Sequence, residues 1–220
     1  MNMKFLTISK FLLVLILPFI LLLLVLNFIG FNSIFYKEKF SEFNVGNISS
    51  LHEKVISFVT GKTEELPAEF NERERQHLAD VRDAREISTI VLYVLIFLFI
   101  LLLIASVFTL KINNLVTNFI GKILVFGGVL TIALAAILFF SINFDFSSTF
   151  ESFHSIFFEK GTYTFDPANE MIVRLYPEHL FMDLGIKISE WVILLSSFLV
   201  MIGIFLIFKS KSKKNKNKGR

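Results

Sequence analysis

The sequence contains no cysteine among its 220 residues. This absence excludes disulfide bonds, a thiolate nucleophile and any cysteine-ligated metal site. The sequence also lacks a Gly-rich phosphate-binding loop, a Gly-x-Ser-x-Gly nucleophile elbow and a His-Glu-x-x-His motif. Any catalysis must therefore come from residues outside the common signatures of soluble enzymes.

Charged side chains are missing from four long apolar runs, residues 11–31, 87–110, 123–142 and 191–208. Each run is long enough to cross a hydrocarbon core of about 30 Å at a rise of ~1.5 Å per residue. Hydrophobic residues make up 54% of the chain, and the mean hydropathy is +0.67. The sequence therefore predicts an α-helical membrane protein with a four-helix transmembrane bundle.

The segments between these runs differ sharply in charge. All 19 acidic residues lie in two stretches, residues 32–86 and 143–190. The remaining segments, residues 1–10, 111–122 and 209–220, contain 11 lysines and arginines and no acid. Basic residues are densest in cytoplasmic segments, so we expect both termini, the loop 111–122 and the basic tail 209–220 to be cytoplasmic. The two acidic stretches then become extracytoplasmic loops on one side of a plasma membrane.

These two loops predict a small mixed α/β outer part. Asn71 has Glu74 three residues later, a spacing typical of a helix start, and the helical pattern of the second span begins already at Glu72. In the second loop, apolar rings recur at helical spacing and predict a short helix at the membrane interface, at Phe146, Phe150, Phe153 and Phe157. Thr162–Phe165 and Met171–Leu175 predict two short strands, with a turn at Asp166–Asn169 between them.

All four histidines lie in the outer loops and are candidates for acid–base chemistry. His77 precedes Asp80 by three residues on a predicted helix, where a carboxylate can orient an imidazole and strengthen it as a base. His154 lies among phenylalanines, where desolvation favours the neutral ring. We expect His52 to be solvated on an amphipathic helix and His179 to lie at the membrane interface.

Other interpretations of these residues remain open. His77 and Asp80 also fit a solvated, charged helix, and His154 also fits an imidazole that reaches the headgroup level. Two histidines and a carboxylate could instead ligate zinc. A non-enzymatic membrane sensor or accessory subunit, whose acidic loops bind a partner, is the alternative to an enzyme.

Two sequence blocks contain the histidines His77 and His154, namely Glu74–Arg82 and Phe153–Phe158. Together with the four-span plan, these blocks resemble the lipoprotein intramolecular transacylase family over residues 5–208. Tyr163 stands where a tryptophan would be expected in that family, which is a conservative difference.

The resemblance implies an acyltransferase that acts on bacterial lipoproteins. Such an enzyme moves the sn-2 acyl chain of the diacylglyceryl-cysteine to the α-amino group of the same cysteine, which yields a lyso-form N-acylated lipoprotein. It implies His77 and His154 as the catalytic pair, acting by general acid–base catalysis. Candidate supporting residues are Asp80, Arg82, Arg85 and Arg174.

The resemblance also implies what this protein binds. The expected partners are the diacylglyceryl-modified N-terminus of a lipoprotein and membrane lipid. No cofactor, metal or nucleic acid is expected. The sequence does not predict the oligomeric state, the acyl-chain preference or which histidine is the base.

Overall fold

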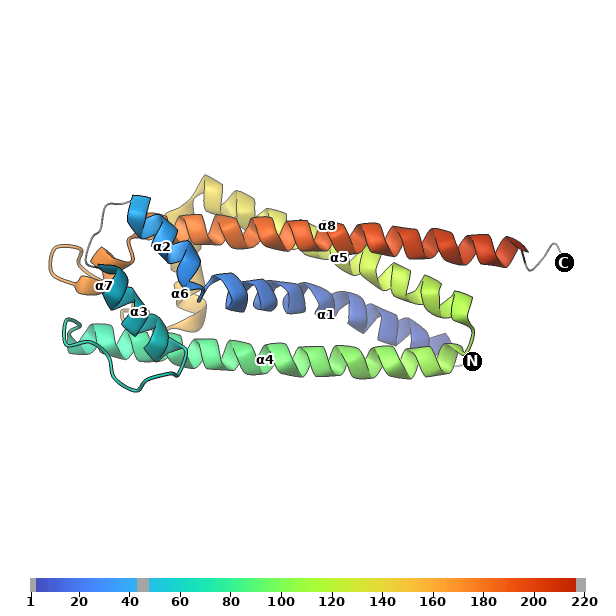
Figure 1. The fold of residues 1–220 in the computed structure, drawn as a ribbon, viewed down its shortest axis with the longest axis horizontal. Helices are drawn as coiled ribbons and strands as arrows, with labels where there is room; N and C mark the ends of the chain where they lie inside the picture. The colour runs from blue at the N-terminus through green and yellow to red at the C-terminus, as the bar shows by residue number, and fades with distance from the viewer. Residues whose placement is uncertain (1–2, 43–47, 217–220) are drawn as a thin grey trace. The chain divides into compact units, whose positions relative to one another are not determined.

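The computed structural model describes residues 3–42 and 48–216 (Figure 1). Within these ranges all regular structure is helical. The helices are α1 (Met3–Ile29), α2 (Ser33–Glu42), α3 (Ile48–Val59), α4 (Glu72–Leu110), α5 (Asn113–Phe144), α6 (Phe146–Phe157), α7 (Met171–Leu175) and α8 (Glu178–Lys216).

Four of these helices, α1, α4, α5 and α8, are long and apolar enough to cross a membrane, judged by length and composition. The helices α4, α5 and α8 contain their charge-free runs in full, and α1 contains the run 11–31 up to Ile29. The prediction of four helices able to span a membrane is confirmed. In α4 the charged segment 72–86 precedes the apolar run 87–110 in one continuous helix. The helical pattern predicted from Glu72 onward is therefore also correct.

The chain divides into two compact units. Unit 1 consists of Met1–Leu24, Val91–Leu138 and Ser189–Arg220, and unit 2 consists of Val25–Ile90 and Phe139–Ile188. Each of the four long helices contributes residues to both units. All the residues predicted to carry chemistry belong to unit 2.

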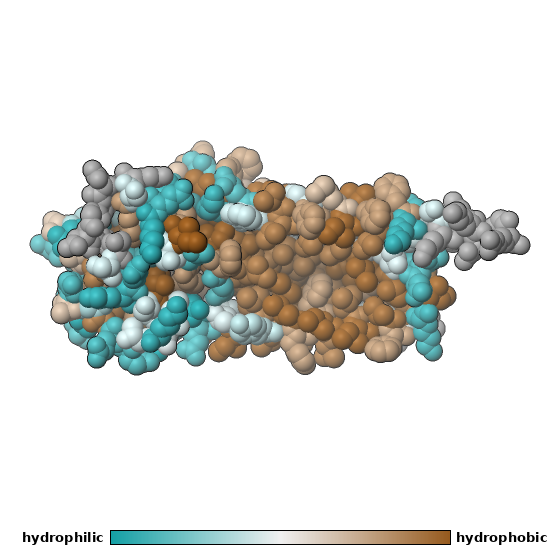
Figure 2. Space-filling view, in the orientation of Figure 1, coloured by the Kyte–Doolittle hydropathy of each residue, from teal (hydrophilic) through white to brown (hydrophobic). Residues whose placement is uncertain are grey.

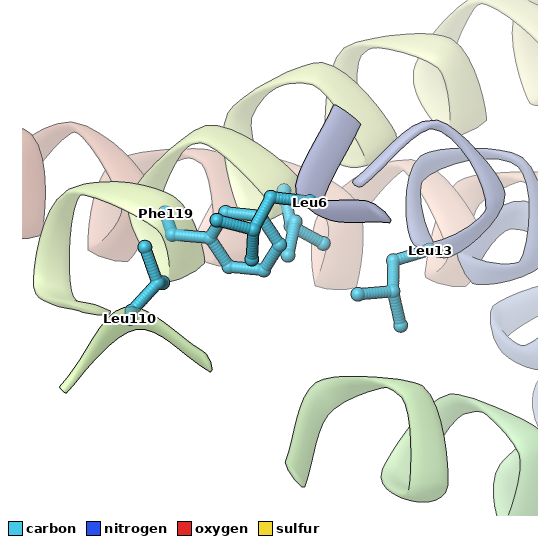
Figure 3. Close-up of a cluster of buried hydrophobic side chains, with 5 residues drawn as sticks. Leu6, Leu13, Leu110 and Phe119 are labelled. Atoms are coloured by element: carbon cyan, nitrogen blue, oxygen red, sulfur yellow. The ribbon is translucent and has the colours of Figure 1, made fainter. Parts of the chain in front are cut away.

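An apolar cluster packs inside unit 1, with members from α1, α4 and α5 (Figure 3). Its buried residues are Leu6, Leu13, Leu110, Phe119 and Ile123. Nearby, the buried hydroxyls of Ser9 on α1 and Ser106 on α4 share a hydrogen bond of 2.6 Å. Helices in lipid associate through such close packing and interhelical hydrogen bonds, because burial from water gives them no further driving force.

Two glycines bring α5 and α8 into close contact in unit 1. A Cβ atom added to Gly121 would lie 2.8 Å from the carbonyl oxygen of Gly203, and one added to Gly203 would lie 2.7 Å from that of Gly121. No ordinary side chain fits at these distances. The pair therefore sets how closely the two helices approach each other.

Large hydrophobic side chains cover the outside of unit 1. On the face shown in Figure 2, hydrophobic residues spread over its long helices. Exposed examples from the four helices are Phe11, Phe97, Phe126 and Phe205. This surface is that of a protein whose solvent is the lipid bilayer.

Unit 2 contains the short helices. On the same face, hydrophilic residues gather over α2 and α3 (Figure 2). An ion pair of 2.8 Å between Lys39 and Asp183 connects α2 to the start of α8. Lys37 on α2 forms a second ion pair, of 2.9 Å, with Glu53 on α3.

The predicted mixed α/β character of the outer part is wrong, because residues 3–42 and 48–216 contain no strand. Met171–Leu175 forms α7, in which Ile172 and Leu175 are buried at helical spacing. Thr162–Phe165 is irregular, and its two aromatic rings pack against separate partners instead of a neighbouring strand. The turn at Asp166–Asn169 is present, since the backbone N–H of Asn169 donates to the carbonyl oxygen of Asp166.

We predict that Gly203→Ala destabilises unit 1. The added methyl group must push the helices apart, at a cost of about 1–3 kcal/mol, and the thermal midpoint in detergent should fall. Ala133→Val adds more volume to an exposed position of α5 and serves as the control. An equal midpoint for Gly203→Ala and Ala133→Val would contradict the close contact of α5 and α8.

Candidate active site

The structure brings His77 and His154 together in unit 2. His77 comes from the charged first part of α4, and His154 comes from α6. The centroids of their rings lie 6.2 Å apart, and the planes are inclined by 25°. Both side chains are buried. Two histidines that are distant in the sequence therefore form one stacked pair.

Aromatic rings enclose this pair. The His77 ring contacts Phe158 and Phe165, at centroid distances of 5.0 and 5.3 Å. The His154 ring contacts Phe150 at 4.0 Å and Tyr163 at 5.0 Å. Tyr163 and Phe165 belong to the irregular segment between α6 and α7, so this segment covers the pair with alternate side chains.

The two rings differ in how their nitrogen atoms are engaged. Nδ1 of His154 lies 2.8 Å from the carbonyl oxygen of Phe150. A carbonyl oxygen only accepts, so Nδ1 carries the hydrogen, and Nε2 of the neutral ring keeps its lone pair. Nδ1 of His77 is buried and has no hydrogen-bond partner in the described part of the chain.

Burial keeps both rings neutral at physiological pH. The pKa of His77 is lowered to about 4, chiefly by burial and also by the neighbouring His154, whereas the charge of Asp80 acts in the opposite direction. Burial also lowers the pKa of His154, but the hydrogen bond to Phe150 and the charge of Glu151 oppose this effect. His154 is therefore held in a neutral state from which it can accept a proton.

A buried carboxylate one turn before His77 connects α4 to α7. The side chain of Glu74 is 1% exposed. One of its oxygens accepts from the backbone N–H of Asn71 at 2.7 Å, and Asn71 Oδ1 accepts from the Glu74 N–H at 3.0 Å. Its other oxygen accepts from the backbone N–H of Ile172 in the first turn of α7, at 2.7 Å. Glu74 therefore caps two helices at once.

The sequence revealed only half of this role. Asn71 and Glu74 are correctly predicted to begin a helix from their spacing, since each side chain satisfies a backbone N–H of the other. The bond to Ile172 joins residues 98 positions apart. No local pattern signals such a contact.

Asp80 and Arg82 have other partners on the surface of unit 2. The carboxylate of Asp80 accepts a hydrogen bond of 3.1 Å from the side-chain amide of Gln76. Asp80 therefore influences His77 through its charge. Arg82 donates to both carboxylate oxygens of Glu64, at 2.7 and 2.8 Å, and covers the ring of Phe58.

Arg85 and Arg174 differ in their surroundings. The guanidinium of Arg85 lies 5.3 Å from the ring centroid of Phe31, and its Nε is buried without a hydrogen-bond partner in the described residues. Arg174 on α7 is exposed, and its nearest polar contact is the sulfur of Met171 at 3.7 Å. Of these two arginines, Arg85 is the one with an unused buried donor.

The prediction that His52 is solvated is wrong, because its side chain is 0% exposed. Its Nδ1 lies 3.0 Å from the hydroxyl of Tyr176, and its ring packs against Tyr36 at 4.3 Å. His52 shares a helical side with the buried residues Val55 and Val59 at spacings of three and four. This spacing could have predicted that His52 is buried, whereas the neighbouring charged residue Glu53 favoured the prediction of a solvated side chain.

The fourth histidine, His179, is exposed near the start of α8. Among the described residues, no group of three histidine, aspartate or glutamate side chains is placed to hold a metal ion. The described residues therefore do not supply the three protein ligands that the zinc site considered from the sequence would need.

The family comparison matches residues 11–181 to the model of lipoprotein intramolecular transacylase Lit. The chain belongs to this family. It is therefore an enzyme, an acyltransferase of lipoprotein modification, and the non-enzymatic alternative is set aside. The comparison with curated proteins gave no match.

Solved structures show the same fold. The in meso structure of the membrane integral lipoprotein intramolecular transacylase Lit from Bacillus cereus matches with a TM-score of 0.80 and 19% identity, over 94% of this chain and 97% of that chain. Two variants of the Bacillus cereus protein, in which a histidine is replaced by arginine or by alanine, each match with a TM-score of 0.76 and 19% identity, over 94% of this chain. The matches extend over 94% of the chain of the arginine variant and 95% of the chain of the alanine variant. The transacylase is therefore a multi-pass membrane protein.

We predict that Glu74→Ala lowers both stability and transacylase activity. The change leaves two backbone N–H groups without an acceptor, at a cost of about 1–3 kcal/mol for each one that stays buried. Glu74→Gln keeps one carbonyl oxygen and should give a smaller loss. Thermal midpoints in detergent measure the effect, with Glu72→Ala at an exposed position of the same helix as the control. Equal midpoints for the Glu72 and Glu74 variants would contradict the double cap.

We also predict that acid destabilises the protein between pH 6.5 and about 4. Burial lowers the pKa of His52 and of His77 from 6.5 to about 4. Above pH 6.5 both rings are neutral in the folded and the unfolded chain, so neither histidine lowers the free energy of unfolding. As the pH falls below 6.5, the unfolded chain binds protons that the folded chain does not, so the free energy of unfolding decreases. Each histidine contributes about 3 kcal/mol at most.

The measurement is the thermal midpoint as a function of pH. His52→Phe removes one titrating group and should flatten the decline between pH 6.5 and 4. His179→Asn, at an exposed position, is the matched control and should follow the parent chain. A His52→Phe curve parallel to that of the parent would show that His52 does not titrate in this window.

Proposed function

We propose that this transacylase moves the sn-2 acyl chain of a diacylglyceryl-cysteine to the α-amino group of that cysteine, with His77 and His154 as its acid–base pair. The observation that carries the proposal is the stacked pair of buried imidazoles in a member of this family. A neutral imidazole is the form that can take a proton from an attacking amine.

The reaction balances without a cofactor. The α-amine has a reference pKa of ~7.7–8.0, so its reactive neutral form is available near neutral pH. The nitrogen attacks the ester carbonyl and forms the new N–C bond. The histidine pair removes the extra proton from nitrogen and delivers a proton to the departing glycerol oxygen as the C–O bond breaks. The product is an amide and a free sn-2 hydroxyl, with no net uptake of protons.

His154 is the better candidate for the base. Its Nδ1 is fixed on the carbonyl oxygen of Phe150, which leaves Nε2 as the basic nitrogen. The charge of Glu151 and this hydrogen bond both favour the protonated ring. The pKa of His77 is lowered to about 4, so once protonated by its neighbour this ring is a strong acid toward the leaving glycerol oxygen.

Each of the four supporting residues has its own role in this proposal. Asp80 stabilises a transient positive charge on His77 through its own negative charge. Arg85, whose Nε is buried and unpaired in the described residues, is suited to hold an oxygen of the lipid headgroup region. Arg82 holds Glu64 and so positions the loop before α4, and Arg174 is exposed for contact with the lipoprotein chain.

Nucleophile and ester belong to one molecule, so most of the catalytic effect comes from holding them in a reactive pose. The aromatic rings around the pair supply an apolar enclosure that excludes water from the ester. From the segment after α6, the rings that touch the histidines are those of Phe158, Tyr163 and Phe165. The partners are the lipid-modified N-terminus of a lipoprotein and the surrounding membrane lipid.

We place this site on the extracytoplasmic side of the plasma membrane, with both termini in the cytoplasm. The support is the dense positive charge of residues 1–10, 111–122 and 209–220.

We predict that His77→Ala and His154→Ala each lower the rate of acyl transfer by roughly 10²–10⁴-fold, because each removes a proton-transfer group. The assay is incubation of a synthetic diacylated lipopeptide with the purified protein. Transfer within one molecule leaves the mass unchanged, so tandem mass spectrometry must locate the acyl chain on the glycerol or on the nitrogen. His179→Ala, an exposed histidine of unit 2, is the control.

A second arm tests whether the transfer stays within one molecule. Two lipopeptides, one with isotope-labelled acyl chains and one with a labelled peptide, are mixed before incubation. We expect no product that combines both labels. Such a crossed product, or a folded His154→Ala variant that reacts at the parent rate, would refute the proposed reaction.

A further inference from the structure

Helix α6, which carries His154, has three distinct sides. Phe150 and His154 face the rest of unit 2, where Phe150 packs on Phe181 at 5.5 Å. A second side is polar and exposed, with Glu151 and Ser155. The third side is apolar and exposed.

The exposed apolar side consists of Phe153, Ile156 and Phe157, and we call it the apolar face of α6. Ile156 is 75% exposed and Phe157 is 57% exposed. These positions are three and four residues apart, so the three side chains form one continuous patch on the helix. Three adjacent large apolar side chains in water are unfavourable, and such a patch marks a contact surface.

This face directly follows an apolar membrane-spanning helix. The end of α5 exposes Phe140 and Phe144, the latter by 94%. Asp145 then ends α5 and begins α6, since its carboxylate accepts from the backbone N–H of Ser148 at 3.0 Å. Only this capping residue separates α6 from a helix that spans the bilayer. The same lipid that covers the end of α5 is therefore within reach of α6.

We propose that the apolar face of α6 is seated in the lipid of the membrane interface, and that the bilayer thereby sets the depth of His154. An amphipathic helix in this position buries its apolar side about 5–10 Å into the boundary between headgroups and acyl chains. His154 lies on the same helix, next to Phe153 and Phe157. The inference rests on the proposed function in one respect, because the ester of a diacylglyceryl group lies at this boundary.

The polarity of the surface around the apolar face of α6 indicates that lipid covers this face. The apolar face continues from a membrane-spanning helix, and its other edge ends in small hydroxyl side chains such as Ser152 and Ser155. These hydroxyls donate back to carbonyl oxygens of their own helix. A gradual change from apolar to weakly polar suits the gradient of polarity across a lipid interface.

Tryptophan fluorescence can measure this depth in the full chain. The sequence has one tryptophan, Trp191, so Trp191→Phe provides a silent background. Phe157→Trp then places a reporter on the apolar face, and Ser155→Trp places a matched control on the polar side of the same helix. The variants are reconstituted in phosphatidylcholine vesicles that contain lipids brominated either near the headgroup or near the end of the chain.

We expect the bromines near the headgroup to quench the Phe157→Trp reporter more strongly than those at the chain end. Aqueous iodide should quench Ser155→Trp more strongly than Phe157→Trp. Strong iodide quenching of both reporters would place the face in water and overturn the inference. Protection of Phe157→Trp from both quenchers would show that protein, such as a second copy of the chain, covers the face, and would overturn it as well.

The outcomes are separable from those of the proposed reaction. Quenching reports position whether or not the protein reacts with a lipopeptide. If lipid quenching is absent while the parent chain transfers the acyl group, only the seating of α6 is wrong. If lipid quenching is present while no acyl transfer occurs, only the proposed reaction is wrong.

Discussion

The buried carboxylate of Glu74 is the interaction on which the rest of the site depends. It joins the first turn of α4 to the first turn of α7 through backbone N–H groups. The segment between α6 and α7 is therefore anchored at its far end, beside the helix that carries His77. That segment supplies Tyr163 and Phe165, which cover the rings of His154 and His77. A single polar side chain thus determines where an apolar enclosure forms.

The enclosure in turn decides the protonation state of the pair. Desolvation penalises a charged imidazole, and two neighbouring imidazoles also penalise each other's charge. Both effects keep the rings neutral, which is the state required to receive a proton from an amine. At His154 the hydrogen bond to Phe150 and the charge of Glu151 act against desolvation, whereas at His77 only the charge of Asp80 does so. The asymmetry gives the two histidines different strengths although they share one environment.

Much of this structure could be predicted because its causes are local. An apolar stretch of 18 or more residues without charge indicates a membrane span, and the Asn71–Glu74 spacing indicates a helix start. Met171–Leu175 was wrongly predicted because its branched side chains favour a strand, whereas the distant Glu74 carboxylate favours a helix. His52 was wrongly predicted because its burial depends on Tyr36 and Tyr176, which come from other segments.

The carbonyl oxygen of Phe150 serves two donors from one residue. As part of α6 it is the ordinary acceptor for the backbone N–H of His154, four positions later, and it also accepts from the ring of that residue. The strength of the base is consequently tied to the winding of the helix at this turn. A local unwinding would release the ring, permit the other tautomer and alter the nitrogen offered to the substrate. In this enzyme, secondary structure is itself a determinant of chemical reactivity.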